Sequence, residues 1–489
     1  MHIALVSIGH GPSLALRNLE RYCRSLPELA DVEISLHDFD VREFQQAREQ
    51  GAQQWSWASK VDEAVAELDR LAPRLIGFSC YLWNTDFSVH LAQLLKRLDP
   101  ERLTVFGGPD AGPRADVLLE LDAVDFVIEG DGELAFSHLL TQLQQETPSW
   151  QQVPGLRFLD GEHLVSNPPA DQPLDLSTLA GVYRQVPDDL NRWAWPHLLY
   201  ETLRGCPYRC SYCMYGKTPM NAKPVDLAVQ ELAELLDRGL VVEIIDPTFT
   251  TYKKRAKEIL RRLGELDYPG SLYLEAYPDS VDEEMAALMS GARVAVVGIG
   301  FQTVSAAGLK AVRRPRNLER FERAVRLLSQ HRIAFYVDVI YGLPGTSLED
   351  FLATVDYLYE VGGEVGDFGL VIYRLLGLPG SPMMEDADKH GLVFSPTPPY
   401  EILRSHDFSL DDVIFCERFR HAFENFTARI PRGEVNRLSD RSGLTVSGLV
   451  RLWIECREDE DLLRQRFVSP EAIPDEELRQ PAEASSMTA

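Results

Sequence analysis

Three cysteines within eight residues, Cys206, Cys210 and Cys213, carry the clearest chemistry in the chain. They follow an apolar, strand-like run, and Gly205 and Pro207 bend the backbone around the first of them. Cysteine sulfur is the preferred protein ligand of iron–sulfur centres, so three thiolates this close together can bind one cluster. Because no fourth cysteine lies nearby, one iron of a four-iron cluster would stay open to an outside ligand.

Other uses of the three cysteines fit the chain less well. A zinc site usually takes four protein ligands, often as two CxxC-like pairs, and no second Cys/His pair with that spacing is present. A disulfide would leave an odd cysteine and would need an oxidising compartment. The remaining cysteines are scattered singly, which favours a reducing compartment; they are Cys23, Cys80, Cys416 and Cys456. Iron–sulfur binding is therefore the favoured interpretation.

The CxxxCxxC spacing, with an aromatic residue before the last cysteine, resembles the signature of the radical S-adenosylmethionine (radical SAM) superfamily. The resemblance implies a [4Fe–4S] cluster held by Cys206, Cys210 and Cys213. It also implies that the amino and carboxylate groups of S-adenosylmethionine chelate the open iron, and that Tyr212 packs beside the adenine.

Composition bounds the class of protein. A chain of 489 residues, 45% hydrophobic and 25% charged, predicts a globular protein of two or three domains. The net charge of −26 disfavours a nucleic-acid partner, which would need a basic face. The chain starts without a basic n-region and has no apolar stretch long enough to span a bilayer. We therefore expect a cytoplasmic protein with no membrane partner.

Strand-like and helical runs alternate over residues 1–148, beginning with the strand-like run 2–8. Such alternation predicts a parallel, doubly wound, Rossmann-like sheet with helices on both faces. A sheet of this kind binds its ligand beyond the carboxyl ends of its strands. Glycines follow several of these ends and would let a bulky cofactor approach the backbone; they are Gly9, Gly11, Gly107, Gly108, Gly130 and Gly132.

Directly upstream of the cysteines, this pattern resembles the cobalamin-binding domain of the cobalamin-dependent branch of radical SAM enzymes. The resemblance implies cobalamin contacts from Ser79, Gly107, Gly108 and Gly130. The Asp-x-His-x-x-Gly motif of proteins that ligate cobalt through histidine is absent, and only His10 stands in place. We therefore expect His10 to be a loop residue and the cobalt to lack a histidine ligand. Loss of cobalamin altogether is the other outcome that this departure leaves open.

Residues 149–195 read as a proline-rich linker with a short hairpin. From 196 to 395 six βα repeats predict a partial triosephosphate-isomerase-type (TIM) barrel, in which chemistry sits at the carboxyl ends of the strands. The family resemblance implies that polar residues at these ends contact S-adenosylmethionine, and that Arg313 or Arg314 meets a carboxylate. The polar residues at the strand ends are Asp246, Glu275, Gln302, Asp338 and Arg374.

A mainly helical region follows over residues 396–478, with helices predicted at 411–428 and 446–463. These helices could cap the barrel mouth and select the substrate, or serve only for packing or dimerisation. The last residues, 479–489, are small and polar, as in a disordered tail.

The cysteine count limits the number of clusters. A methylthiotransferase would need a second triad in its N-terminal domain, which holds only Cys23 and Cys80. Relatives that modify peptides through auxiliary clusters need several C-terminal cysteines, and only Cys416 and Cys456 are available. The sequence therefore predicts a single cluster and disfavours tRNA methylthiolation.

The resemblance as a whole implies a cobalamin-dependent radical SAM methyltransferase. Such an enzyme uses a 5′-deoxyadenosyl radical and methylcobalamin to methylate an unactivated carbon of a small molecule or natural product, and takes electrons from a donor such as flavodoxin or ferredoxin. One alternative is a radical SAM enzyme that cyclises or rearranges its substrate without methylation. Another, from a different class, is a non-catalytic cobalamin sensor, which would leave the cysteine triad without a purpose.

Overall fold

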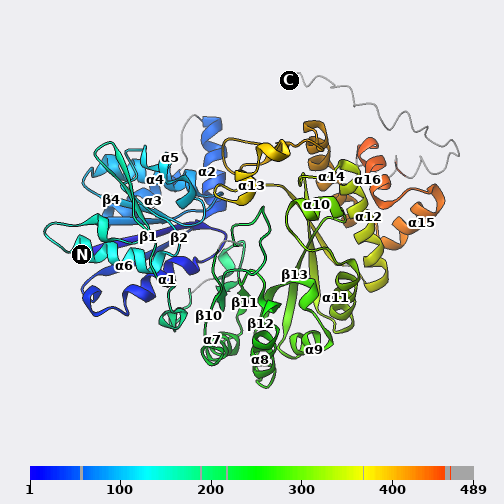
Figure 1. Ribbon diagram of the computed structural model, residues 1–489, viewed down its shortest axis with the longest axis horizontal. Helices are drawn as coiled ribbons and strands as arrows, with labels where there is room; N and C mark the ends of the chain where they lie inside the picture. Colours follow the sequence, from blue (N-terminus) through cyan, green and yellow to red (C-terminus); the bar gives the residue numbers. More distant parts are fainter. Residues whose placement is uncertain (55–58, 188–189, 216–217, 367, 458–462, 464–489) are drawn as a thin grey trace.

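The computed structural model describes residues 1–54, 59–187, 190–215, 218–366, 368–457 and 463. An N-terminal sheet domain lies beside a barrel-like domain, and a group of C-terminal helices packs on the far side of the barrel (Figure 1). The tail predicted at 479–489 lies outside the described residues. No helix in the described part of the chain combines the length and the hydrophobicity needed to cross a bilayer.

The N-terminal sheet has seven strands in the order β2-β1-β3-β4-β5-β6-β7, of which the first five in that order are parallel. The parallel strands are β1 (His2–Gly9), β2 (Glu33–Asp40), β3 (Leu75–Ser79), β4 (Leu103–Gly107) and β5 (Phe126–Ile128). The hairpin predicted after residue 149 forms β6 (Leu156–Asp160) and β7 (His163–Ser166), which extend this sheet in antiparallel fashion.

Helices cover both faces of this sheet, so the predicted doubly wound fold is confirmed. One face carries α1 (Leu14–Cys23) and α6 (Gly132–Leu143), which contact each other. The other face carries α2 (Val41–Gln54), α3 (Ser59–Arg70), α4 (Thr85–Leu98) and α5 (Ala115–Leu119). Each face has its own apolar core. All five residues of β3 are buried, as expected for a central strand covered on both sides.

The second sheet has six parallel strands in the order β15-β14-β13-β12-β11-β8. They are β8 (Leu198–Tyr200), β11 (Val241–Ile244), β12 (Ser271–Ala276), β13 (Val294–Gln302), β14 (Ala334–Tyr341) and β15 (Gly369–Arg374). The connecting helices are α7 (Val225–Asp237), α8 (Lys253–Gly264), α9 (Glu283–Gly291), α10 (Ala306–Ala311), α11 (Leu318–Gln330) and α12 (Leu348–Val365). Because β8 and β15 are the two edges of the sheet, the barrel is open, which confirms the predicted partial barrel.

The C-terminal region is mainly helical, as predicted. It holds the short strand β17 (Ile402–Arg404) and the helices α14 (Leu410–Arg429), α15 (Arg432–Ser442) and α16 (Val446–Glu455). Helix α13 (Pro382–Glu385) and strand β16 (Val393–Phe394) precede it, within the span predicted as barrel. The last of these ends earlier than the predicted 446–463. Helix α16 packs on α12 and α14, and the three share one apolar core with the barrel. The C-terminal helices are thus part of the barrel's support.

Substitution of Trp453, in α16, tests how much the C-terminal helices contribute to the stability of the barrel. Its side chain is fully buried, with its ring 5.7 Å from that of Phe426. We expect Trp453→Ala to destabilise the protein by about 3–5 kcal/mol. The protein loses the free energy of burying the indole, and the cavity that remains leaves the neighbouring side chains without packing contacts. Thermal or urea unfolding measures this. Ile414→Ala, which removes an exposed side chain from α14, should change stability by less than about 0.5 kcal/mol. Equal losses in the two variants would contradict the assignment.

Candidate functional site

The loop that carries the three cysteines is fixed at its start by Gly205. The two residues before Gly205 form β9 (Leu203–Arg204), which pairs with β10 (Asn221–Ala222). Gly205 has φ +86°, and a Cβ there would lie 2.5 Å from the carbonyl oxygen of Pro219 and 2.7 Å from that of Thr218. Both the backbone angle and the space exclude a side chain. The chain therefore turns tightly at Gly205 and delivers Cys206 to the barrel mouth.

All three cysteines line one cavity of about 600 Å³, which residues of β11, β12, β13 and β14 also line. The backbone N–H of Cys213 donates to the carbonyl of Cys210, at 3.1 Å. Burial raises the pKa of the Cys206 thiol, the backbone N–H of Tyr208 lowers it, and the neighbouring Cys213 and Cys210 raise it further. The three thiols are thus close enough to interact electrostatically.

The donor set fits an iron–sulfur cluster better than a single ion. In the described part of the chain, no group of three or more Cys, His, Asp or Glu side chains converges on one point suited to a metal ion. A four-iron cluster does not require such a point, because each cysteine ligates its own iron. The three thiols share a cavity wall with room beside them, which is the arrangement a cluster with one open iron needs.

Arg314 is the cation beside these sulfurs. Its Nη1 lies 3.7 Å from Cys210 Sγ and 3.5 Å from the Tyr212 hydroxyl, and its Nη2 donates to the carbonyl of Gly300 at 2.5 Å. Its guanidinium also lies over the ring of Tyr277, 5.0 Å from the centroid. Burial lowers the pKa of Arg314, and the Tyr212 and Cys210 side chains raise it by more, so the guanidinium stays charged. A fixed positive charge beside these sulfurs would offset part of the negative charge of a bound cluster and its ligands.

Asp246 lines the cavity, but its carboxylate is already used. It is fully buried and accepts hydrogen bonds from Thr202 N at 2.7 Å, from Thr202 Oγ1 at 2.5 Å and from Leu203 N at 2.9 Å. Burial raises its pKa to about 6, against the lowering effect of these hydrogen bonds. The structure therefore places Asp246 where it fixes the backbone that enters the cysteine loop.

Glu275 and Asp338 stand on β12 and β14, on either side of β13. Glu275 Oε1 accepts from the Tyr336 hydroxyl at 2.6 Å. Gly298 lies in register between Glu275 and Tyr336, and a Cβ there would be 2.2 Å from Glu275 Oε1, so only glycine lets them meet. Asp338 Oδ1 is buried without a hydrogen-bond partner among the described residues. Burial and the charge of Glu275 raise the pKa of Asp338 to about 7.

Three of the predicted S-adenosylmethionine residues, Asp338, Gln302 and Arg374, do not line this cavity. Gln302 is buried with φ +75°, and its Oε1 has no partner in the part of the chain that the structure describes. Arg374 pairs with Glu401 at 2.9 Å and donates to the carbonyl of Ile402 at 2.7 Å. Arg374 thus ties β15 to the segment that leads into β17. Because the partners of Arg374 come from a later segment of the chain, the pattern of polar residues at strand ends could not predict this structural role.

A second cavity, of about 500 Å³, lies between the two domains. The loops after β1, β3, β4 and β5 form one wall, where the structure brings together the four predicted cobalamin residues, Ser79, Gly107, Gly108 and Gly130. Gly108 has φ +111°, and a Cβ there would lie 2.5 Å from the carbonyl oxygen of Cys80. Gly130 has φ +88° with nothing within 4 Å of a Cβ position. The backbone therefore leaves space for a large ligand, and exposed His10 lies on the same wall.

Residues from the linker and the barrel, which the sequence did not single out, form the other wall. Several of them line both cavities, so the two cavities adjoin. His197 stacks on Tyr273 with ring centroids 4.4 Å apart. The residues common to both cavities are Trp195, His197, Tyr215, Glu243 and Ile245. Trp195 and Tyr215 are half-exposed, and such exposed aromatic rings are a signal for a binding surface that only the fold reveals.

Comparison with known proteins agrees with this geometry. Residues 6–140 match the family described as B12 binding domain, and residues 200–358 match the radical SAM superfamily. The chain thus contains a B12-binding domain followed by a radical SAM domain. The two domains imply a [4Fe–4S] cluster, S-adenosylmethionine and cobalamin as cofactors, together with an external reductant.

Individual relatives are similar over much of the chain. The cobalamin-dependent radical SAM methyltransferase TokK of Streptomyces tokunonensis is 26% identical over 65% of this chain and 50% of its own length. The radical SAM methyltransferase TsrM of Kitasatospora setae has a similar structure, with TM-score 0.65, 21% identity and coverage of 82% of this chain and 79% of that one. The cobalamin-dependent radical enzyme OxsB gives TM-score 0.67 at 14% identity, over 95% and 74%. The chain spans about half the length of the first curated relatives it matches.

Gly205→Ala should prevent assembly of the cysteine loop, because the new methyl group would overlap two carbonyl oxygens. We expect purified, anaerobically reconstituted variant to hold less than about a tenth of the iron of the parent protein, from a clash that costs several kcal/mol. Gly161→Ala is the matched control, since Gly161 also has positive φ but has open space around it. Equal iron contents in the two variants would refute the steric argument.

Asp338→Asn should change the pH dependence of stability. The pKa of Asp338 is about 7 in the folded protein, whereas the usual value, expected in the unfolded chain, is 3.8. The free energy of unfolding therefore falls as the pH rises from 3.8 to 7. The amide cannot ionise. The cofactor-free variant should therefore be about 2 kcal/mol more stable than the parent at pH 8, after allowance for partial solvation, with a smaller gain at pH 5. Melting temperatures at both pH values measure this. Glu265→Gln, at an exposed site, should show no such trend.

Proposed function

We propose that the chain is a cobalamin-dependent radical SAM methyltransferase that methylates a carbon of a small molecule. The observation that carries this proposal is that the two cavities adjoin and share five lining residues. One cavity presents three cysteines and the other a glycine-lined cradle. A cofactor in each would face a common space where a substrate could reach both. TokK and TsrM, which resemble this chain, are both named methyltransferases.

The residues would hold the cofactors as follows. Cys206, Cys210 and Cys213 would ligate the cluster. Tyr212 and Glu275 would contact S-adenosylmethionine in the same cavity, with the free oxygens of Asp338 and Gln302 near it on β14 and β13. Ser79, Gly107, Gly108 and Gly130 would hold cobalamin. Bound together, these groups supply a 5′-deoxyadenosyl radical and a transferable methyl group.

The chain's own residues position the reactants and exclude water. Arg314 offers a fixed positive charge beside Cys210, suited to the carboxylate of an amino acid group. The aromatic side chains of Trp195, Tyr215 and Tyr273 form a wall at the junction, which would shield a reactive carbon radical from solvent. Glu243 lies on the same wall, where burial raises its pKa against the lowering effect of a hydrogen bond from Trp195.

The substrate class is a small molecule or natural-product intermediate. Its place is the shared space bounded by the large, half-exposed rings of Trp195 and Tyr215. The electron would come from a flavodoxin or ferredoxin. A methylated product would gain one CH₂ unit in mass, whereas a cyclised or rearranged product would not.

Cys210→Ala tests the proposal at its centre. We expect the variant to lose the cluster, and with it the formation of 5′-deoxyadenosine under dithionite, by more than about 100-fold, because two thiolates cannot hold four irons. Cys416→Ala is the control, since it removes a buried thiol from α14, away from the site. Iron analysis and chromatography measure both quantities. Undiminished 5′-deoxyadenosine in Cys210→Ala, or a parent protein that binds cluster but no cobalamin, would overturn the proposal.

A further inference from the structure

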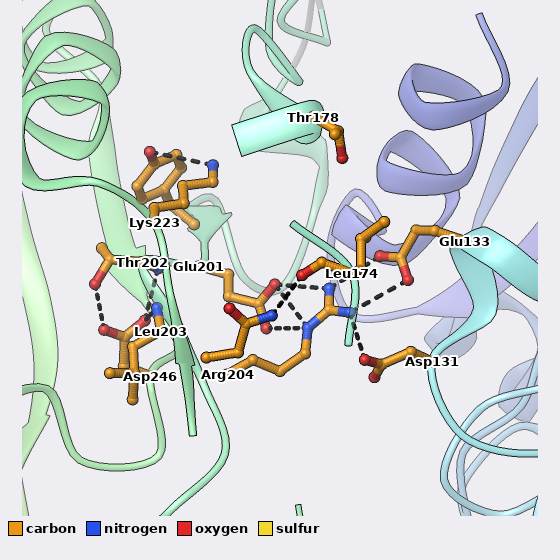
Figure 2. A network of polar contacts seen from close by, with 12 residues as sticks. Asp131, Glu133, Leu174, Thr178, Glu201, Thr202, Leu203, Arg204, Lys223 and Asp246 are labelled. Carbon is orange, nitrogen blue, oxygen red and sulfur yellow. Dashed lines mark hydrogen bonds and ion pairs between the residues drawn. The ribbon is translucent and has the colours of Figure 1, made fainter. Parts of the chain in front are cut away.

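Arg204 connects the two domains directly beside the cysteine loop. It lies in β9, two residues before Cys206, and its side chain extends to the N-terminal domain (Figure 2). There its Nη1 and Nη2 donate to Glu133 Oε2 at 3.2 Å and Glu133 Oε1 at 2.9 Å, a two-point contact, and its Nη1 is 3.3 Å from Asp131 Oδ2. Among the ion pairs between described residues, those of Arg204 join the N-terminal sheet domain to the barrel.

The same guanidinium is held from the barrel side as well. Its Nε and Nη2 donate to Glu201 Oε1 at 3.1 Å and to Glu201 Oε2 at 2.9 Å, so all three nitrogens of the guanidinium are used. The side chains of Arg204, Glu201 and Glu133 are 14%, 16% and 6% exposed. Burial lowers the pKa of Arg204, and Glu133 and Glu201 raise it by more. The charge is therefore permanent and the geometry is fixed by two planar forks.

The backbone on each side of this contact leads to one of the two cavities. On the barrel side, Asp246 holds the N–H groups of Thr202 and Leu203, and β10 pairs with Arg204 itself (Figure 2). On the other side, Asp131 and Glu133 begin α6, immediately after Gly130. Gly130 belongs to the cradle of the second cavity, and Arg204, Glu201, Asp131 and Glu133 also line that cavity. One side chain thus links the wall of the second cavity to the loop of the first.

We propose that Arg204 is a positioning residue that sets the spacing between the corrinoid in the second cavity and the cluster in the first. This inference rests on the proposed function. Glu133 fixes the guanidinium relative to the β5–α6 loop, and the rigid β9 segment transmits that position to Cys206. Other polar contacts of the N-terminal domain, such as that from the Tyr400 hydroxyl to Asp110 Oδ1 at 3.3 Å and that from Trp195 N to the carbonyl of His10 at 3.0 Å, start from segments outside the cysteine loop.

The test compares full-length proteins reconstituted with cluster and cobalamin. Arg204→Gln/Glu133→Gln removes the cation and its buried anion together, so it avoids leaving Glu133 buried without its partner. Arg204→Lys keeps the charge but not the planar fork. Arg157→Gln is the matched control, because Arg157 pairs with Glu129 of the same loop, at 2.9 Å, and both of its ion pairs among the described residues stay within the N-terminal domain. Optical titration with hydroxocobalamin gives the affinity of each protein.

The decisive measurement is the distance distribution between the reduced cluster and cob(II)alamin from pulsed electron paramagnetic resonance. The parent and Arg157→Gln should give one narrow distribution. The double variant and Arg204→Lys should give a broadened or displaced distance distribution. At saturating cobalamin, both variants should release S-adenosylhomocysteine at least about tenfold more slowly than the parent, because small misplacements of reacting groups lower the rate strongly.

A merely structural role would weaken cobalamin binding or lower the melting temperature, but would leave the distance and the rate at saturation unchanged. That result would overturn the inference, as would a parental distribution in Arg204→Lys. If the parent itself binds no cobalamin, the proposed function fails first. A parent that binds and reacts, beside variants that match it at saturation, refutes only the role of Arg204.

Discussion

The site depends on the fixed backbone of residues 202–206. Three features hold this segment: the carboxylate of Asp246, the pairing of β9 with β10, and the tight turn at Gly205. Arg255 adds hydrogen bonds to Thr202 Oγ1 at 2.8 Å and to its carbonyl at 3.0 Å. A cysteine loop has no regular structure of its own, so it can present three sulfurs in a constant arrangement only if its entry is held in this way.

The polar groups around the site are of two kinds. Asp246 and Arg374 have all the partners they need, and they hold the fold together. Asp338 and Gln302 each keep a buried oxygen without a partner among the described residues, which costs stability in the absence of a ligand. Such groups persist where a bound molecule supplies the missing donor. Polar residues at equivalent strand ends therefore differ in role: some hold the fold together, and others keep an oxygen available for a bound molecule.

Much of this arrangement follows from the sequence, and the missing part has a physical cause. The periodicity of the apolar residues predicts both sheets, because each apolar run must be buried. The spacing of the cysteines predicts the loop that would bind the cluster. Glycines at strand ends indicate the second cavity. The roles of Arg204, Trp195 and Glu243 could not be predicted in this way, since each depends on how two domains meet. Arg374 shows the same limit, because its partner Glu401 lies 27 residues later on another element.

The open barrel explains why the cysteine loop lies at the domain boundary. Strand β8, which leads to the cysteines, has only three residues and pairs with β11 alone, so its other edge is free of barrel strands. The segment before and beside β8 uses that edge: the Tyr183 hydroxyl donates to the carbonyl of Leu199 at 2.6 Å, and Trp195 N reaches the loop after β1. A closed barrel would have buried this edge against another strand. Leaving it open brings the cluster loop next to the loops of the Rossmann-like domain, which is the geometry that chemistry shared between two cofactors requires.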